Sequence, residues 1–134
     1  MTTYIIAYLA ALIFFLVIDI LWLGGVAKKI YGRQLGKLMT RNIRWGAAFV
    51  FYTLYILGVV IFAIRPGIEA QSLSTALTFG ALYGFFCYMT YDLTNLATLK
   101  NWPEKLIWID IPWGTVLTGT AAVFGTWIAL LFIG

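Results

Sequence analysis

Three of the five acidic residues, Asp19, Asp92 and Asp110, lie inside long apolar stretches. Insertion of an aspartate at the middle of a bilayer is unfavourable by roughly 2.5–3.5 kcal/mol, so such residues normally face a bundle interior or a wet cavity. There a carboxylate can bind a cation, exchange a proton or act as a general acid or base. The three aspartates are therefore the first candidates for functional groups.

Aromatic and amide side chains accompany these aspartates at helical spacing. A tryptophan follows two of the aspartates by three residues, which places it on the same helix face. A tyrosine directly precedes the third aspartate, and an asparagine follows it within one turn. The predicted ligand-binding or proton-titrating set is therefore Asp19, Trp22, Tyr91, Asp92, Asn95, Asp110 and Trp113.

The composition places these groups in a membrane protein. The chain has 134 residues, of which 63% are hydrophobic and only 10% are charged. Its mean hydropathy is +0.94. A chain this short cannot bury so much apolar surface in a core of its own. Apolar runs near 4–26, 46–64, 73–99 and 106–132 are each about long enough to span a bilayer. We expect an all-α, four-helix membrane bundle that forms one transmembrane domain over residues 1–134.

Basic residues are concentrated between the first two runs. Together with the loop at 100–105, this segment holds eight of the nine Lys and Arg residues, and Arg65 is the ninth. The positive-inside rule then puts both termini outside the cytoplasm. The segment has the pattern of a basic helix lying in the interface, and a solvated basic loop is the alternative. The residues predicted to bind anionic lipid headgroups are Lys28, Lys29, Arg33, Lys37, Arg41 and Arg44.

The absence of histidine limits the chemistry. Without histidine the chain lacks the commonest general base and the usual haem, di-iron and zinc ligands. We predict no metal and no cofactor. A single cysteine, Cys87, allows no disulfide within the chain and is predicted to be a small core residue. No soluble basic domain is present, so nucleic acid is not an expected partner.

Small residues indicate close helix packing in the last two apolar runs. Gly80 and Gly84 form a GxxxG pair, and Ala121, Gly125 and Ala129 repeat every four residues. Such faces serve contacts within one chain or between copies, so a homo-oligomer stays open. Asp92 continues the line of Gly80 and Gly84 and should therefore point inward.

A longer string gives a resemblance to a known family. Residues Tyr91 to Thr98 read YDLTNLAT, and Trp102, Asp110 and the Trp113-Gly114 pair follow; Trp22 to Gly24 and the Lys28 to Tyr31 stretch complete the pattern. Together they resemble a family of small bacterial inner-membrane proteins of unknown function. The resemblance covers nearly the whole chain. It implies a four-span bacterial membrane protein and carries no activity with it.

Three function classes fit these observations. The leading hypothesis is binding or transport of a small molecule or lipid, with or without a linked proton, in a carboxylate-lined pocket near the cytoplasmic leaflet. The second is an enzyme that modifies a membrane lipid, which is less favoured because the chain contains no dense ligand motif such as Asp-x-x-Asp. The third is a non-catalytic accessory subunit whose aspartates join helices by hydrogen bonds.

Overall fold

The computed structural model describes residues 1–26 and 44–133, which are helical except in short connections. Helix α1 (Thr2–Leu21) continues into a π-helical turn, η1 (Trp22–Val26). Helix α3 (Trp45–Val59) continues through a second π-helical turn, η2 (Val60–Ile64), into α4 (Arg65–Ala70). Two long helices follow, α5 (Leu73–Thr98) and α6 (Glu104–Ile133). The all-α architecture expected from the sequence is confirmed.

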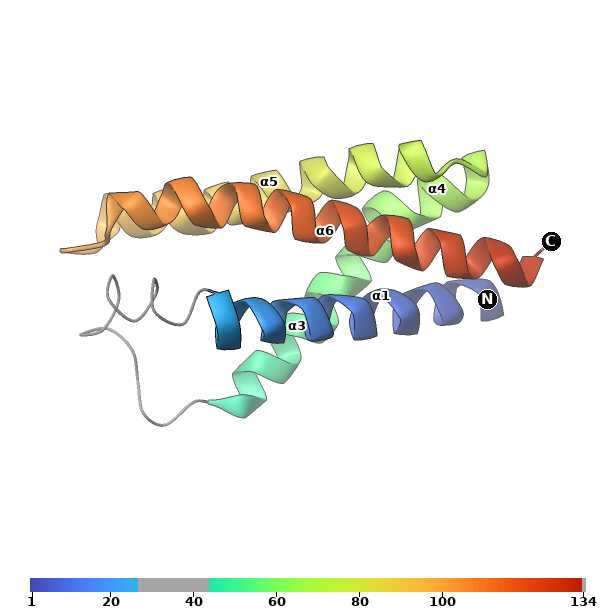
Figure 1. Ribbon diagram of the computed structural model, residues 1–134, viewed down its shortest axis with the longest axis horizontal. Coiled ribbons are helices and arrows are strands. Elements are labelled where there is room, and N and C mark those ends of the chain that lie inside the picture. Colours follow the sequence, from blue (N-terminus) through green and yellow to red (C-terminus); the bar gives the residue numbers. More distant parts are fainter. Residues whose placement is uncertain (27–43, 134) are drawn as a thin grey trace.

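Helix α6 is the centre of the bundle. Figure 1 shows α1, α5 and α6 running along the long axis, while α3 crosses them at an angle. Helix α6 packs against α5 on one side and against α1 on the other. Both termini lie at the same end of the molecule (Figure 1). Because α3 crosses at an angle, the first turns of α3 lie apart from α5 and α6, and a cavity lies in the space between them.

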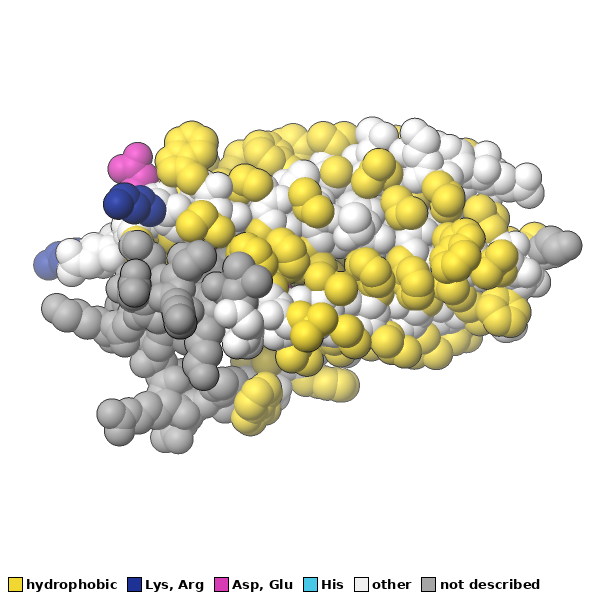
Figure 2. All heavy atoms as spheres, viewed as in Figure 1, with side chains coloured by type: hydrophobic (Ala, Val, Ile, Leu, Met, Phe, Trp, Pro, Cys, Tyr) yellow, Lys and Arg dark blue, Asp and Glu magenta, His cyan; other side chains and the backbone are white. Residues whose placement is uncertain are grey.

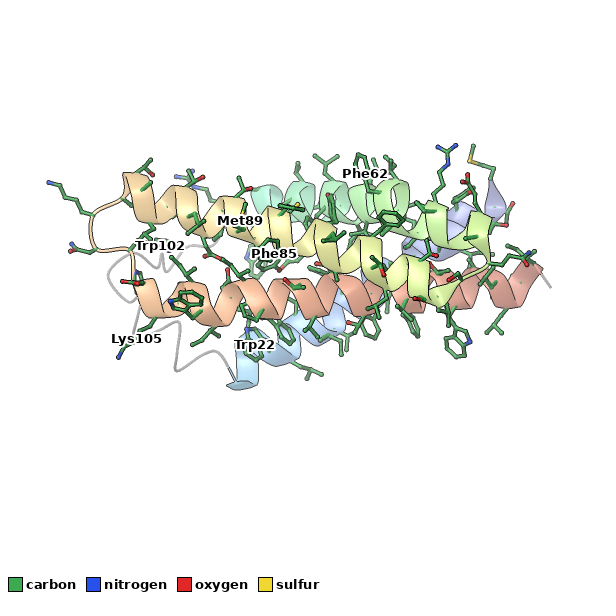
Figure 3. The ribbon with its side chains drawn as sticks, turned by 90° about the horizontal axis from the view of Figure 1, so that it is seen from above. Trp22, Phe62, Phe85, Met89, Trp102 and Lys105 are labelled. Carbon is green, nitrogen blue, oxygen red and sulfur yellow. The ribbon has the colours of Figure 1, made fainter. Side chains whose placement is uncertain are left out.

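Three of the described helical segments are long and apolar enough to cross a membrane: Thr2–Gly25, Trp45–Ala70 and Glu104–Ile133. Helix α5 has comparable length but does not meet the same criterion, because its many Ser, Thr and Gly residues lower its hydropathy. The predicted span at 73–99 therefore stays a prediction. Its pairing with α6 over much of its length, visible in Figures 1 and 3, supports it.

The second apolar helix is longer than the sequence predicted. We expected it to end at residue 64 and a loop to fill 65–72, but residues up to Ala70 are helical. Pro66 lacks the amide that would bond to the preceding turn, and the helix accommodates it at the junction between the π-helical turn η2 and α4. The reversal occurs at Gln71, which has a φ of 48°, and Ser72 then caps α5 by accepting a hydrogen bond from the Thr75 amide at 3.1 Å.

The GxxxG face of α5 packs against α6 within the chain. A Cβ atom at Gly80 would lie 2.7 Å from the Ala122 Cβ and 3.1 Å from the Thr118 carbonyl oxygen. A Cβ atom at Gly84 would lie 2.5 Å from the Gly114 carbonyl oxygen. Real Cβ atoms do not occupy such positions next to backbone, so only glycine allows the two helices to approach this closely.

The small residues of α6 face the opposite neighbour. Ala121, Gly125 and Ala129 are all buried. A Cβ at Gly125 would lie 3.0 Å from the Ala7 carbonyl oxygen and 3.1 Å from the Ala11 Cβ, so this stripe packs against α1. The repeat at spacing four therefore joins α1 to α6, and both small-residue patterns are used inside one copy of the chain.

Most of the predicted headgroup-binding segment lies outside the described residues. This applies to the expected interfacial helix and to Lys28, Lys29, Arg33, Lys37 and Arg41. Arg44 is described, is exposed and directly precedes α3. Figure 2 shows that the visible face carries mainly hydrophobic side chains, with the coloured acidic and basic side chains gathered at one end.

Candidate ligand-binding site

A cavity of about 940 Å³ lies between the ends of the four long helices, where α3 diverges from α5 and α6. Small-molecule sites usually measure 300–1,000 Å³. Ten of its sixteen lining residues are aromatic, and two are aspartates. The lining consists of Asp19, Trp22, Leu23, Phe51, Tyr52, Tyr55, Tyr83, Phe86, Cys87, Tyr88, Thr90, Tyr91, Trp102, Leu106, Asp110 and Trp113.

The first aspartate joins two helices at the cavity wall. Asp19 is only 8% exposed, and the Tyr52 hydroxyl donates a hydrogen bond to its Oδ2 at 2.6 Å. This is a short bond to a carboxylate, which is among the stronger types in proteins. It connects α1 with α3 across the widening space between them, so it holds the cavity wall in place as well as satisfying the acid.

The other two aspartates face each other across the α5–α6 contact. Asp92 is 0% exposed and follows Gly84 and Tyr88 along the face of α5 that packs on α6. Its carboxyl group interacts with that of Asp110, and Asp110 also interacts with Asp19. Asp110 lines the cavity, whereas Asp92 lies behind the lining. The structure therefore brings the carboxyl groups of Asp92 and Asp110 into contact and places Asp19 within electrostatic range of Asp110.

Two tryptophans cover one side of this acidic region. The indole rings of Trp22 and Trp113 stack, with centroids 4.1 Å apart and planes 11° from parallel. Trp113 also interacts with Asp19, but its indole N–H makes no hydrogen bond of normal geometry to any described group. A buried N–H without an acceptor is unfavourable, so the pocket retains capacity to bind a polar atom of a ligand or water.

The remaining predicted residues lie at the rim. Tyr91 lines the cavity, and its ring meets Trp102 edge-on at a centroid distance of 5.9 Å. Asn95 interacts with Tyr91 but does not line the cavity. Figure 3 shows Trp22 at the end of α1 and Trp102 in the α5–α6 connection, towards the same end of the bundle as Lys105. Trp102 belongs to the pocket, while Trp108, at 74% exposure, faces outward.

Pro112 lies inside α6 rather than in its first turn, because α6 begins at Glu104. Its position two turns later removes the amide that would bond to the Trp108 carbonyl. This interruption occurs between Asp110 and Trp113, two of the three residues of α6 that line the cavity.

Sequence reasoning missed the tyrosines of the wall. Tyr52 pairs with Asp19, and the Tyr55 hydroxyl lies 2.8 Å from Thr118 Oγ1 in a buried hydrogen bond. Tyr83 and Cys87 also line the cavity, and Cys87 is only half-buried rather than a core residue. A signal was present, since a tyrosine within an apolar run needs a partner for its hydroxyl. Tyr83, Cys87 and Tyr91 also repeat every four residues along α5.

The three aspartates do not resemble a metal centre. Among the residues that the structure describes, no group of three or more His, Cys, Asp or Glu side chains is arranged to hold a metal ion. The neighbours of Asp19 are instead the phenol of Tyr52, which donates a hydrogen bond to it, and the indole of Trp113. This arrangement can orient carboxyl groups towards an organic ligand.

The fold and the site together define an all-α membrane protein with an acid-containing aromatic cavity between its helices. A family model described as predicted membrane protein (DUF2177) matches residues 4–127, and the chain belongs to that family. Neither a curated protein nor a solved structure matches the chain. The resemblance seen in the sequence is therefore confirmed at the level of a membrane protein family of unknown function.

Proposed function

We propose that the protein binds a hydrophobic organic cation in this cavity. The observation that carries the proposal is the combination of ten aromatic side chains with Asp19 and Asp110, and with no Lys or Arg, in the described lining. Aromatic faces attract cations by about 0.5–2 kcal/mol each when water is excluded. The carboxylates supply the opposite charge, and the rings supply the apolar contact area.

The binding test uses two ions of nearly the same shape. Tetraphenylphosphonium and tetraphenylborate are both hydrophobic, but their charges are opposite. We expect the phosphonium ion to bind to the detergent-purified protein and to quench the fluorescence of Trp22 and Trp113, which line the cavity. Equal binding of both ions, or binding of the borate ion only, would contradict the proposal because the site would then not select for positive charge.

Variants of the two aspartates that line the cavity test whether the phosphonium ion binds there. Asp19→Asn and Asp110→Asn should each weaken phosphonium binding about tenfold, which corresponds to about 1.4 kcal/mol. Glu104→Gln is the matched control, because Glu104 is an exposed acid near the same end of the bundle and does not line the cavity. The control should bind as the unmodified protein does.

We further propose that the cavity end faces the cytoplasm of a bacterial inner membrane, with both termini outside. Arg44, Lys100 and Lys105 accompany the cavity end, and the termini share the opposite end. Basic residues near membrane ends favour the cytoplasmic side. In a Cys87→Ala background, Glu69→Cys should react with an impermeant maleimide in intact cells, and Glu104→Cys should react only after lysis. The reverse labelling pattern would overturn this orientation.

A further inference from the structure

Asp92 is the most deeply buried acidic group in the described structure. Its exposed fraction is 0%, and its carboxyl oxygens meet no described hydrogen-bonding group other than the carboxyl group of Asp110. An ionised carboxylate in such a place would lose its hydration without compensation, which is strongly unfavourable. Asp92 is therefore ionised only when a nearby positive charge offsets its negative charge.

The group that faces Asp92 is another acid. Asp110, on α6, interacts directly with the Asp92 carboxyl group, and Tyr91 interacts with both. On the cavity side, Asp19 from α1 and Tyr88 from α5 also interact with Asp110, and Tyr52 from α3 is bonded to Asp19. Among the described residues, no Lys or Arg is found among the partners of Asp92 or Asp19.

Two carboxyl groups in contact within a protein interior cannot readily both ionise, so the fully buried Asp92 keeps its proton. The position of this pair is asymmetric. Asp110 lines the cavity, where a bound cation would lie, and Asp92 is closed off behind it. A cation seated against Asp110 would offset the negative charge of an ionised Asp92 behind it and thereby favour loss of the Asp92 proton.

We infer that a cation enters this site beside Asp110 in exchange for the proton of Asp92. The proton passes to water as the cation arrives, one positive charge replaces another, and the net charge of the occupied region does not change. No bond other than the O–H bond breaks. The inference rests on the proposed binding of an organic cation and adds to it a proton-linked exchange with a defined proton carrier.

The pH dependence of tetraphenylphosphonium affinity tests the exchange. Tetraphenylphosphonium has no proton of its own to lose, so any linked proton comes from the protein. Exchange of one proton for one cation makes the affinity rise by about tenfold per pH unit, measured from about pH 6 to about pH 8. Binding that is the same at every pH would overturn the exchange and leave the proposed binding intact. Absence of phosphonium binding at every pH would overturn both.

Two variants identify the residue that releases the proton when the cation binds. In Asp92→Asn, the amide can donate a hydrogen bond to Asp110 but holds no exchangeable acid proton, so the affinity should become nearly independent of pH. Asp19→Asn is the matched variant in the same cavity; it should weaken binding but retain the pH slope. A full slope in Asp92→Asn, or loss of the slope in Asp19→Asn alone, would show that the proton comes from elsewhere.

A second measurement does not depend on a folded variant. Titration calorimetry of the unmodified protein with tetraphenylphosphonium is repeated in two buffers that differ in their heats of ionisation. Proton release on binding makes the observed enthalpy differ between the buffers, by an amount that corresponds to about one proton per cation. Identical enthalpies in the two buffers would overturn the exchange even if Asp92→Asn failed to fold.

Discussion

The two ends of this bundle are built in different ways. Towards the termini, glycine and alanine allow α6 to approach α5 and α1 until backbone meets side chain, as at Gly80 and Gly125. Towards the cavity, α3 diverges from α5 and α6, and large aromatic rings line the space between them. The first end is held by close packing over many atoms, and the second by a few polar contacts and ring stacks. The difference indicates that close packing supports the fold at one end, whereas the other end leaves a cavity between the helices.

The largest expected effect comes from filling the closely packed end. Gly80→Leu would place its side chain against the Thr118 carbonyl oxygen and the Gly119 Cα, which cannot move without separating α5 from α6. We expect a loss of about 3 kcal/mol in stability, at the upper end of the usual range for overpacking. Thermal unfolding in detergent measures it.

Gly46→Leu is the control for that substitution. Gly46 lies in the first turn of α3, and no atom lies within 4 Å of a Cβ built there. The same change should therefore leave the unfolding temperature nearly unaltered. If the two variants unfolded at the same temperature, close packing would not distinguish this end of the bundle from the other.

An intermediate effect is expected at the cavity end. Tyr52→Phe removes the donor at 2.6 Å from Asp19 and leaves a largely buried carboxyl oxygen without its partner. Hydrogen bonds to charged groups contribute about 1.5–3 kcal/mol, and we expect a loss of about 2 kcal/mol. A double-mutant cycle that combines Tyr52→Phe with Asp19→Asn measures the coupling energy between the two side chains. Additive effects in the cycle would show that the bond does not hold α1 to α3.

The smallest effect is expected at the ion pair near the termini. Arg65 Nε lies 3.1 Å from Glu69 Oε1, but both side chains are more than 60% exposed. Exposed pairs at this spacing contribute about 0.3–0.5 kcal/mol. Glu69→Gln should therefore change the unfolding temperature very little, and high salt should remove even that difference. A loss as large as that of Tyr52→Phe would mean that polar contacts support both ends equally.

The sequence alone determined the class of protein and the inward-facing position of Asp92 on its helix. Hydropathy required a membrane environment, the apolar runs gave the long helices, and the line from Gly80 to Asp92 gave the face of α5 that turns inward. These are local properties, since a period of 3.6 residues fixes which side chains share a face. The continuation of the second apolar helix through Pro66 was missed, because neighbouring turns decide whether a proline ends a helix.

Only the tertiary structure decided which inward faces meet. The pairing of Asp92 with Asp110 rather than with Asp19, and of Asp19 with Tyr52, joins residues on different helices that no spacing along the chain connects. The cavity likewise depends on the angle at which α3 crosses the other helices, and that angle follows from where small and large side chains happen to face one another. Helix periodicity specifies a face but not its partner, because the partner is selected by packing over the whole bundle.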